Sequence, residues 1–367
     1  MIGIRPAEPA MLVLARESRS MTQAEVAQAM TKSGSDAVSQ GYVSRAESGR
    51  LAVSGERLHL YAAALGYPTE LLLLNPQVHG VGIGLVHHRK RASLTATALR
   101  RQHAQLALTR IQLDGIMGGR YPPAAGRASV PSLSVDAFTS AKDAAREVRT
   151  AWRMQSGPVS DVTSVVEAAG VLVVSRDLGS RRLDAVSQWD GVQAPLLLVN
   201  DQAPGDRYRF SLAHELGHLV LHRAPGDSAA QEREADDFAS EFLMPARDIH
   251  SVFTGRIDLS VLAELKGRWR VSMAALLRRA HSLSAVSDWQ YRSLMVEMSA
   301  LGYRTAEPVE VPREQPQRVA QSVREALERG TSLERLASCA CLLPEDFQQL
   351  YTPARDRGGE SASKVRP

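Results

Sequence analysis

The sequence has little cysteine and no long apolar run. Its two cysteines, Cys339 and Cys341, are separated by one residue, which is too close for an ordinary disulfide framework, and no other cysteine exists to complete a metal site. We expect both to be reduced thiols. There is no apolar run of about 18 residues, and the N-terminus has no secretory hydrophobic region. We therefore expect a cytoplasmic protein that neither spans a membrane nor is exported.

The sequence also lacks internal repeats and a strong charge imbalance. The chain has 367 residues, a formal net charge of +4 and 44% hydrophobic residues. This length accommodates two or three domains with real cores. The isoelectric point near 9.2 permits an anionic partner.

Residues 8–76 have the pattern of a small helical domain. Thr22-Gln-Ala-Glu25 is a capping box that starts a second helix after a first one at 9–19. A polar turn at 31–37 separates it from a third helix at 39–49, which Gly49 ends. Two short helices with a turn between them, inside a unit of four or five helices, are typical of a helix-turn-helix.

The order Thr-Gln-Ala-Glu … Ser-Arg-Ala-Glu-x-Gly resembles the XRE (Cro/C1-type) family of DNA-binding domains. The resemblance covers 8–76, with a longer turn than usual. It implies a third helix in the major groove of operator DNA, bound by a homodimer, and a structural role for Glu47. The candidate DNA contacts are Gln23, Gln40, Tyr42, Ser44 and Arg45. The alternative is a protein–protein module that no longer binds DNA.

Residues 77–133 read as a linker helix and a loop. The segment 87–101 carries five Arg or Lys and no acid, so it either adds phosphate contacts or is a solvated basic face. A helical apolar pattern continues to Met117, and 118–131 is rich in Gly, Pro and Ala. His87 and His88 have no nearby residues that complete a metal site.

The motif His214-Glu-Leu-Gly-His218 carries the strongest chemical signal. On a helix, which we expect to start at an N-capping Ser211, the four-residue spacing puts both imidazoles on one face. Two such imidazoles can bind one Zn²⁺, and Glu215 beside them can take a proton from water. The pentapeptide alone also occurs by chance in unrelated proteins.

A second helix, stopped by Pro245, supplies candidates for a third ligand. Glu232 can complete the site and Asp236 can accept the spare N–H of a ligating His. Glu234 is the rival ligand, and all three acids are otherwise a solvated helix face. His222 continues the row of histidines, and we interpret it as structural, near the helix end.

The run Arg209-Phe-Ser-Leu-Ala-His-Glu-Leu-Gly-His … Glu232-x-Glu-Ala-Asp-x-Phe-Ala-x-Glu-Phe-Leu-Met-Pro245 resembles the ImmA/IrrE family of metallopeptidases over 141–281. The resemblance implies that His214, His218 and Glu232 bind the metal and that Glu215 is the catalytic base. The metal would be Zn²⁺, or Mn²⁺. Tyr208 and Arg209 are weak candidates for stabilising an oxyanion.

Short apolar runs at 171–175, 185–189 and 195–200 predict a small sheet before the motif helix. We expect a zincin-like α+β domain at 134–283. Either 185–189 or 196–200 would form a sheet edge that aligns the substrate backbone. The alternative is that both are core strands. Helices at 259–269 and 272–283 are expected to pack on this domain. Residues 284–351 read as a helical region and 352–367 as a disordered tail.

The expected fold is mainly α with a small α+β domain: a five-helix helix-turn-helix domain, a zincin-like catalytic domain with a short sheet, and a helical C-terminal region. The expected function is a DNA-binding transcriptional regulator with a zinc-dependent endopeptidase domain. By the family resemblance, its substrate would be a repressor or antitoxin-like protein, or this chain itself near 80–130. The alternative is a transcription factor whose zincin-like domain senses a ligand or metal and cleaves nothing.

Overall fold

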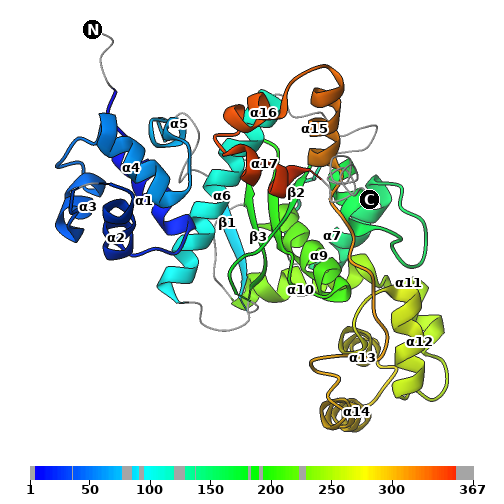
Figure 1. Cartoon of the computed structure of the whole chain (residues 1–367). Helices are drawn as coiled ribbons and strands as arrows, with labels where there is room; N and C mark the ends of the chain where they lie inside the picture. Colours follow the sequence, from blue (N-terminus) through cyan, green and yellow to red (C-terminus); the bar gives the residue numbers. More distant parts are fainter. Residues whose placement is uncertain are drawn as a thin grey trace, which may run out of the picture. The chain divides into compact units, whose positions relative to one another are not determined.

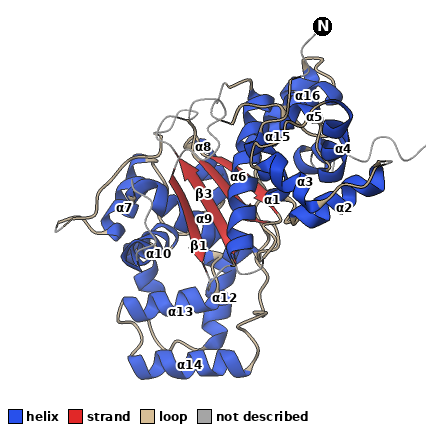
Figure 2. Cartoon of the chain, turned by 90° about the vertical axis from the view of Figure 1, so that its left-hand side faces the viewer, coloured by secondary structure: helices blue, strands red, loops and turns tan. Residues whose placement is uncertain are grey.

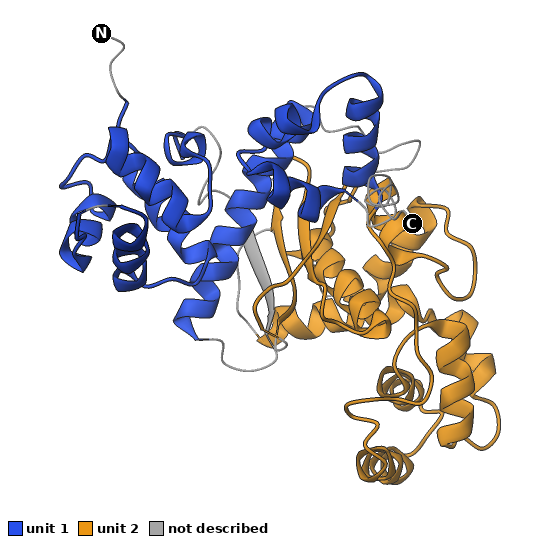
Figure 3. Cartoon of the chain, viewed as in Figure 1, with its two compact units in different colours: residues 1–84, 93–121, 317–367 blue, residues 85–92, 122–316 orange. Residues whose placement is uncertain are grey.

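The computed structural model divides the chain into two compact units (Figure 3). The first comprises residues 1–84, 93–121 and 317–367, and the second comprises 85–92 and 122–316. The residues described are 5–34, 36–76, 85–90 (backbone only), 95–119, 129–136, 138–180, 183–189, 193–222 and 229–352. No helix within these ranges is long and apolar enough to cross a membrane.

The N-terminal part of the first unit is the expected five-helix domain (Figure 1). Its helices are α1 (Pro9–Ser18), α2 (Gln23–Ser33), α3 (Gln40–Glu47), α4 (Gly55–Leu65) and α5 (Thr69–Leu72). The capping box predicted at Thr22 is confirmed, since the Thr22 hydroxyl accepts from the Glu25 N–H and the Glu25 carboxylate accepts from the Thr22 N–H. Gly66 ends α4 in a left-handed conformation that glycine adopts without strain.

The rest of the first unit is built around one long helix. The expected linker helix is α6 (Ala96–Met117), and it packs against α1, α15 (Arg318–Glu328) and α16 (Leu333–Cys339). At Gly115 a Cβ would lie 1.8 Å from the Cys339 carbonyl oxygen, so only glycine allows this close approach. The last helix is α17 (Pro344–Tyr351), whose Tyr351 hydroxyl donates to Gln112 of α6.

The second unit contains a four-stranded mixed sheet in the order β1-β3-β4-β2 (Figure 2). The strands are β1 (Leu85–Lys90), β2 (Leu172–Arg176), β3 (Leu183–Trp189) and β4 (Leu196–Asn200). β2 and β4 are parallel, whereas β3 is antiparallel to both of its neighbours. β4 is buried along its whole length, as its continuous apolar run requires.

The second unit also contains helices, some of which pack against the sheet. They are α7 (Ala141–Ala151), α8 (Val162–Ala168), α9 (Gly205–Leu221), α10 (Ala229–Leu243), α11 (Ala246–Ile249), the 3₁₀ turn η1 (His250–Phe253), α12 (Leu259–Trp269), α13 (Met273–Ser282) and α14 (Asp288–Ala300). Leu212 and Leu216 of α9 share one buried cluster with Leu197 of β4, Leu265 of α12 and Leu276 of α13. The prediction that the helices at 259–269 and 272–283, which are α12 and α13, pack on the catalytic core is confirmed.

The structure corrects three expectations about these elements. β3 lies between β1 and β4, and β4 lies between β3 and β2, so neither 185–189 nor 196–200 is a sheet edge. The motif helix starts at Gly205 after an extended Pro204, whereas Ser211 is buried inside the helix and caps nothing. The linker helix was expected to have its basic start at 87–101, but it begins at Ala96, and 85–90 form β1, whose sequence has no alternating pattern.

The architecture is mainly helical with a small sheet, as predicted. The domain boundaries drawn from the sequence stay predictions, and the structure adds that the C-terminal helices share a unit with α6. Most of the Gly/Pro-rich loop, at 120–128, and nearly all of the predicted tail, from 353 onward, lie outside the described residues.

Candidate metal centre

Two helices in close contact bring the candidate ligands together. His214 and His218 lie on one face of α9, and Glu232 lies in the first turn of α10. The contact depends on Gly217, where a Cβ would come within 3.2 Å of the Ala235 Cα and the Phe238 Cβ of α10. Even one added carbon at 217 would require the neighbouring atoms of α10 to move by a few tenths of an ångström.

The three side chains form a compact cluster, and their ligand atoms all lie within 4.8 Å of one another. His214 Nε2 and His218 Nε2 are 3.1 Å apart. The Glu232 carboxylate oxygens lie 3.5 Å from His214 Nε2 and 3.4 Å from His218 Nε2. Both histidines are buried, whereas the Glu232 side chain is 33% exposed, so the site opens on the side of the carboxylate.

This donor set fits a divalent metal ion. Ligands about 2.0–2.1 Å from a tetrahedral Zn²⁺ are separated from one another by about 3.3 Å. The 3.1 Å between the two imidazole nitrogens is close to that edge length, and each of these nitrogens has one oxygen of the Glu232 carboxylate within 3.5 Å. Two imidazoles and one carboxylate also leave a fourth position open, which is the pattern of catalytic rather than structural zinc sites.

Glu215 lies beside the cluster as a buried carboxylate with one oxygen unused. Its Oε2 accepts a 2.5 Å hydrogen bond from the Ser187 hydroxyl of β3. Its Oε1 is buried without a hydrogen-bond partner among the described residues. Burial raises the pKa of Glu215, against the lowering effect of His218, His214 and the Ser187 hydroxyl. A buried acceptor without a partner is costly, so Oε1 is the atom that a water molecule at the site would satisfy.

Residues outside the cluster hold the orientation of the His214 and His218 imidazoles. His214 Nδ1 lies 2.9 Å from Asp236 Oδ1, as the sequence suggested for the spare N–H. His218 Nδ1 lies 2.9 Å from His222 Nδ1, and His222 Nε2 lies 2.9 Å from Glu234 Oε2. When each N–H in this row donates toward Glu234, His218 Nε2 keeps its lone pair for a metal.

This arrangement gives His222 and Glu234 a role that the sequence did not assign. Glu234 is outside the three-residue cluster and pairs with His222, so the structure does not group it with the candidate ligands. His222 is more than an end-of-helix residue, since it contacts His218 directly. The row of three histidines at four-residue spacing was the available signal, whereas nothing in the sequence pointed to Ser187.

Burial holds the Glu232 side chain in a partly desolvated position. Desolvation alone would raise its pKa, but the hydrogen bonds with His214 and His218 outweigh that effect and lower it. The pKa of His222 is lowered, chiefly by burial. The first direction favours an ionised carboxylate at Glu232, which metal binding needs, and the second favours a neutral imidazole at His222.

The two candidates for oxyanion stabilisation, Tyr208 and Arg209, are buried on another side of α9. Arg209 is fully buried in an ion pair with Glu314 and donates to the Val159 carbonyl. Tyr208 is buried as well, and burial raises its pKa. Neither lies on the face of α9 that carries His214, so the expectation is not supported.

The helix-turn-helix residues form a second candidate site. The Gln40 amide donates to Gln23 Oε1 at 2.7 Å, so the first residues of α2 and α3 brace each other. Gln40 and Arg45 are exposed, whereas Tyr42 and Ser44 are half-buried. The Arg57 guanidinium lies over the Tyr42 ring, 5.6 Å from its centroid.

The structural role of Glu47 is confirmed. Its carboxylate accepts from Arg16 at 2.7 Å, from Gln23 at 2.9 Å and from the Tyr61 hydroxyl at 3.3 Å. These bonds tie α1, α2 and α4 to α3 and leave the outer face of α3 clear.

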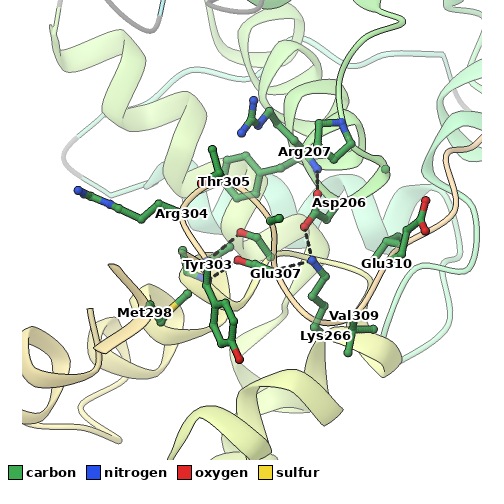
Figure 4. Close-up of a pocket in the computed structure, with 18 of the residues that line it drawn as sticks. Asp206, Arg207, Lys266, Met298, Tyr303, Arg304, Thr305, Glu307, Val309 and Glu310 are labelled. Atoms are coloured by element: carbon green, nitrogen blue, oxygen red, sulfur yellow. Dashed lines mark hydrogen bonds and ion pairs between the residues drawn. The ribbon is translucent and has the colours of Figure 1, made fainter. Parts of the chain in front are cut away.

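A separate pocket of about 520 Å³ lies at the start of α9 (Figure 4). In it, Lys266 is held between Asp206 at 2.7 Å and Glu307 at 2.6 Å. Burial lowers the pKa of Lys266, but these two carboxylates outweigh it and raise the pKa overall. None of the His–His–Glu cluster lines this pocket, so the pocket and the candidate metal centre are different places.

Two segments match known family models. Residues 166–281 match the IrrE N-terminal-like domain model of a peptidase family, and residues 12–72 match a helix-turn-helix model. The first segment contains the whole His–His–Glu cluster together with β2, β3 and β4. No curated protein matches the chain.

Proposed function

Because the chain joins an XRE-type helix-turn-helix segment to an IrrE/ImmA-like peptidase-family domain, we propose that it is a transcriptional regulator with a zinc-dependent endopeptidase. Its substrate is a repressor or antitoxin-like protein, or this chain. The single observation that carries the enzymatic part is the buried cluster of His214, His218 and Glu232 beside the unsatisfied Glu215 Oε1.

In this proposal, His214, His218 and Glu232 hold Zn²⁺, with Mn²⁺ as the other candidate. The bound ion supplies Lewis acidity, which polarises the scissile carbonyl and lowers the pKa of water at the site. Glu215 takes the water proton at Oε1 and delivers it to the leaving amine. Burial of Glu215 suits this role, because a raised pKa brings the carboxylate closer to the working pH of a general base.

Other residues orient these groups. Ser187 fixes the rotation of the Glu215 carboxylate and turns Oε1 to the site. Asp236 and the His222–Glu234 pair fix the two ligating imidazoles. A pure metal sensor would need the three ligands but would have no use for a buried, unpaired base.

The DNA-binding part of the proposal rests on the face of α3. Gln40, Tyr42, Ser44 and Arg45 meet the major groove, and Gln23 contacts phosphate at the start of α2. A homodimer then reads a palindromic operator with half-sites about one helical turn apart. The protein acts in the cytoplasm, where operator and protein substrate are both accessible.

The second candidate is a transcription factor whose zincin-like domain senses a ligand and cleaves nothing. The observation in its favour is the pocket around Lys266, which is large enough for a small molecule and is lined by none of the three candidate metal ligands.

Promoter switching distinguishes the two functions. Cells carrying Glu215→Gln should keep metal and operator binding, because the substitution retains every ligand and every DNA contact. Under the proposal these cells fail to switch the target promoter in response to the inducing signal. Normal switching by Glu215→Gln would favour the sensor.

A further inference from the structure

β1 is an addition to the part of the chain that matches the peptidase family. Its residues, Leu85–Lys90, lie between the two matched segments, 12–72 and 166–281, and belong to neither. The other three strands of the sheet all lie inside the second segment. Without β1, the described sheet would therefore end at β3.

The covered edge is the one next to the candidate catalytic base. β1 runs antiparallel to β3 with His87 paired to Ser187, and facing residues in such a pair have Cα atoms about 4.5–5.5 Å apart. Ser187 is the residue whose hydroxyl donates to Glu215. The backbone of β1 thus passes one strand spacing from the group that orients the base.

The motif helix also lies alongside both strands. α9, which carries the two candidate histidine ligands, packs against β3 and against β1 (Figure 2). The other edge of the sheet, β2, is separated from β3 by β4 and has no contact of this kind with Glu215. Without β1, the edges of the described sheet would be β3 and β2, and of these two only β3 is placed to align a peptide with the metal centre.

An extended protein segment commonly binds by adding a strand to a sheet edge, where main-chain hydrogen bonds hold it. We propose that β1 occupies the strand position that an extended protein substrate takes along β3, so that the chain carries a tethered competitor for its own site. This inference rests on the proposed endopeptidase function. A substrate strand pairs with β3 only after β1 has left.

The pairing of β1 has the properties of a releasable contact. The strand is six residues long, and its register shifts between His88 and Lys90, opposite the start of β3. Such a shift interrupts the ladder of main-chain hydrogen bonds, so fewer of them must break on release. Release therefore controls how much of the protein can accept substrate.

Cross-linking tests the position of β1 in the full chain. Leu85 and Trp189 are Cα partners, whereas Leu85 and Gln188 are one residue out of register and lie on opposite faces. In a Cys339→Ser/Cys341→Ala background, Leu85→Cys/Trp189→Cys should form a disulfide on mild oxidation. The matched Leu85→Cys/Gln188→Cys chain should not, and equal cross-linking of both chains, or of neither, overturns the proposal.

Peptide binding tests whether β1 holds the substrate position. The probe is a fluorescent, terminally blocked peptide with the sequence of residues 85–90, and the protein is metal-free so that the peptide histidines bind no ion. The cross-linked Leu85→Cys/Trp189→Cys chain should bind no probe, and reduction should restore binding. Binding that is unchanged by the cross-link contradicts the proposal.

A released variant gives the opposite result. Successive residues of a strand point their N–H groups to opposite edges, so either Val86 or His87 points its N–H toward β3. The double substitution Val86→Pro/His87→Pro removes that N–H in either case. The parent chain binds the probe only in the fraction of molecules from which β1 has left. If that fraction is about a tenth or less, the variant should bind the probe roughly tenfold tighter or better than the parent chain. Equal affinity for the parent and the variant overturns the competitor role.

These readouts are independent of catalysis, because neither needs metal or turnover. Successful cross-linking and peptide competition, together with a Glu215→Gln chain that switches its promoter normally, would keep the strand assignment and reject the peptidase. Failed cross-linking with a Glu215-dependent promoter would reject the strand assignment and keep the peptidase.

Discussion

Ser187 on β3 donates a 2.5 Å hydrogen bond to Glu215 Oε2 on α9, and both side chains are fully buried. This bond links the sheet to the motif helix at the candidate catalytic base. It leaves Oε1 as the carboxylate oxygen without a hydrogen-bond partner among the described residues. It also lowers the pKa of a carboxyl group that burial raises.

Ser187→Ala should therefore move the acidic limb of the pH–rate profile upward. Without the hydroxyl, the pKa of Glu215 rises further, so a higher pH is needed to ionise the base. A lost hydrogen bond to a charged group of about 1.5–3 kcal/mol corresponds to a shift of about one to two pH units. Ser187→Thr keeps a hydroxyl and is the control. An unshifted limb in Ser187→Ala would show that this bond does not tune the base.

Measurements of metal affinity should distinguish the candidate ligand Glu232 from Glu234 and His222, which only orient a ligand. Glu232→Ala should lose the ion, because it removes one of three ligands. Glu234→Ala and His222→Ala should retain it with affinity reduced by roughly 10–100-fold, since they only release the orientation of His218. Titration with Zn²⁺ and metal analysis of the purified chains measure both effects. If Glu234→Ala lost the metal and Glu232→Ala retained it, Glu234 rather than Glu232 would be the third ligand.

A second carboxylate, Glu241, anchors the helix that carries Glu232, and its removal should lower the free energy of unfolding. Glu241 accepts from the fully buried Arg279 and from Arg146, at 2.9 Å for the latter. Glu241→Gln leaves the Arg279 charge uncompensated and should destabilise the second unit by about 3 kcal/mol. Asp237→Asn on the same helix breaks only the exposed pair with Lys142 and should cost less than about 1 kcal/mol.

Urea unfolding followed by tryptophan fluorescence measures this difference, because all four tryptophans lie in the second unit. Burial would raise the pKa of Glu241, but its arginine partners lower it below the unfolded value of about 4.5. The stabilisation by Glu241 is therefore present above pH about 4.5 and is lost as the pH falls through the lower folded value. A Glu241→Gln chain as stable as the parent at pH 7 would contradict the anchor.

DNA binding should respond differently to changes in two residues of α3. Arg45→Ala should weaken operator binding and reduce its salt dependence, if the exposed guanidinium contacts phosphate. Gln40→Ala should weaken binding by about 1–3 kcal/mol and relax the preference at one base pair. Footprinting and titration over the protein's own promoter test both. A footprint that is unchanged in a chain lacking residues 1–80 would remove the DNA-binding assignment.

Local signals in the sequence were sufficient for most of the helices and for the candidate ligands. The capping box at Thr22, the glycine stops and the four-residue spacing of His214 and His218 each depend on neighbours along the chain. The family resemblance then placed Glu232, and the structure brings it within reach of both histidines.

Features that depend on distant partners were missed. β1 forms because β3 offers an edge, not because 85–90 has a strand pattern. Ser187 and the His222–Glu234 pair gain their roles only when β3, α9 and α10 meet. By contrast, α17 begins with Pro344 and two acids, a helix-start signal that the sequence does contain.

The most direct test of the peptidase is cleavage by purified protein loaded with Zn²⁺. The full chain and the Glu215→Gln chain are each incubated with the proteins encoded beside them, and products are identified by mass spectrometry. Metal content is measured in the same samples. The account predicts defined fragments of a partner protein, or of this chain, with the parent only, although both chains bind one metal ion. The same fragments from Glu215→Gln, or no fragments from a fully metal-loaded parent, would contradict it.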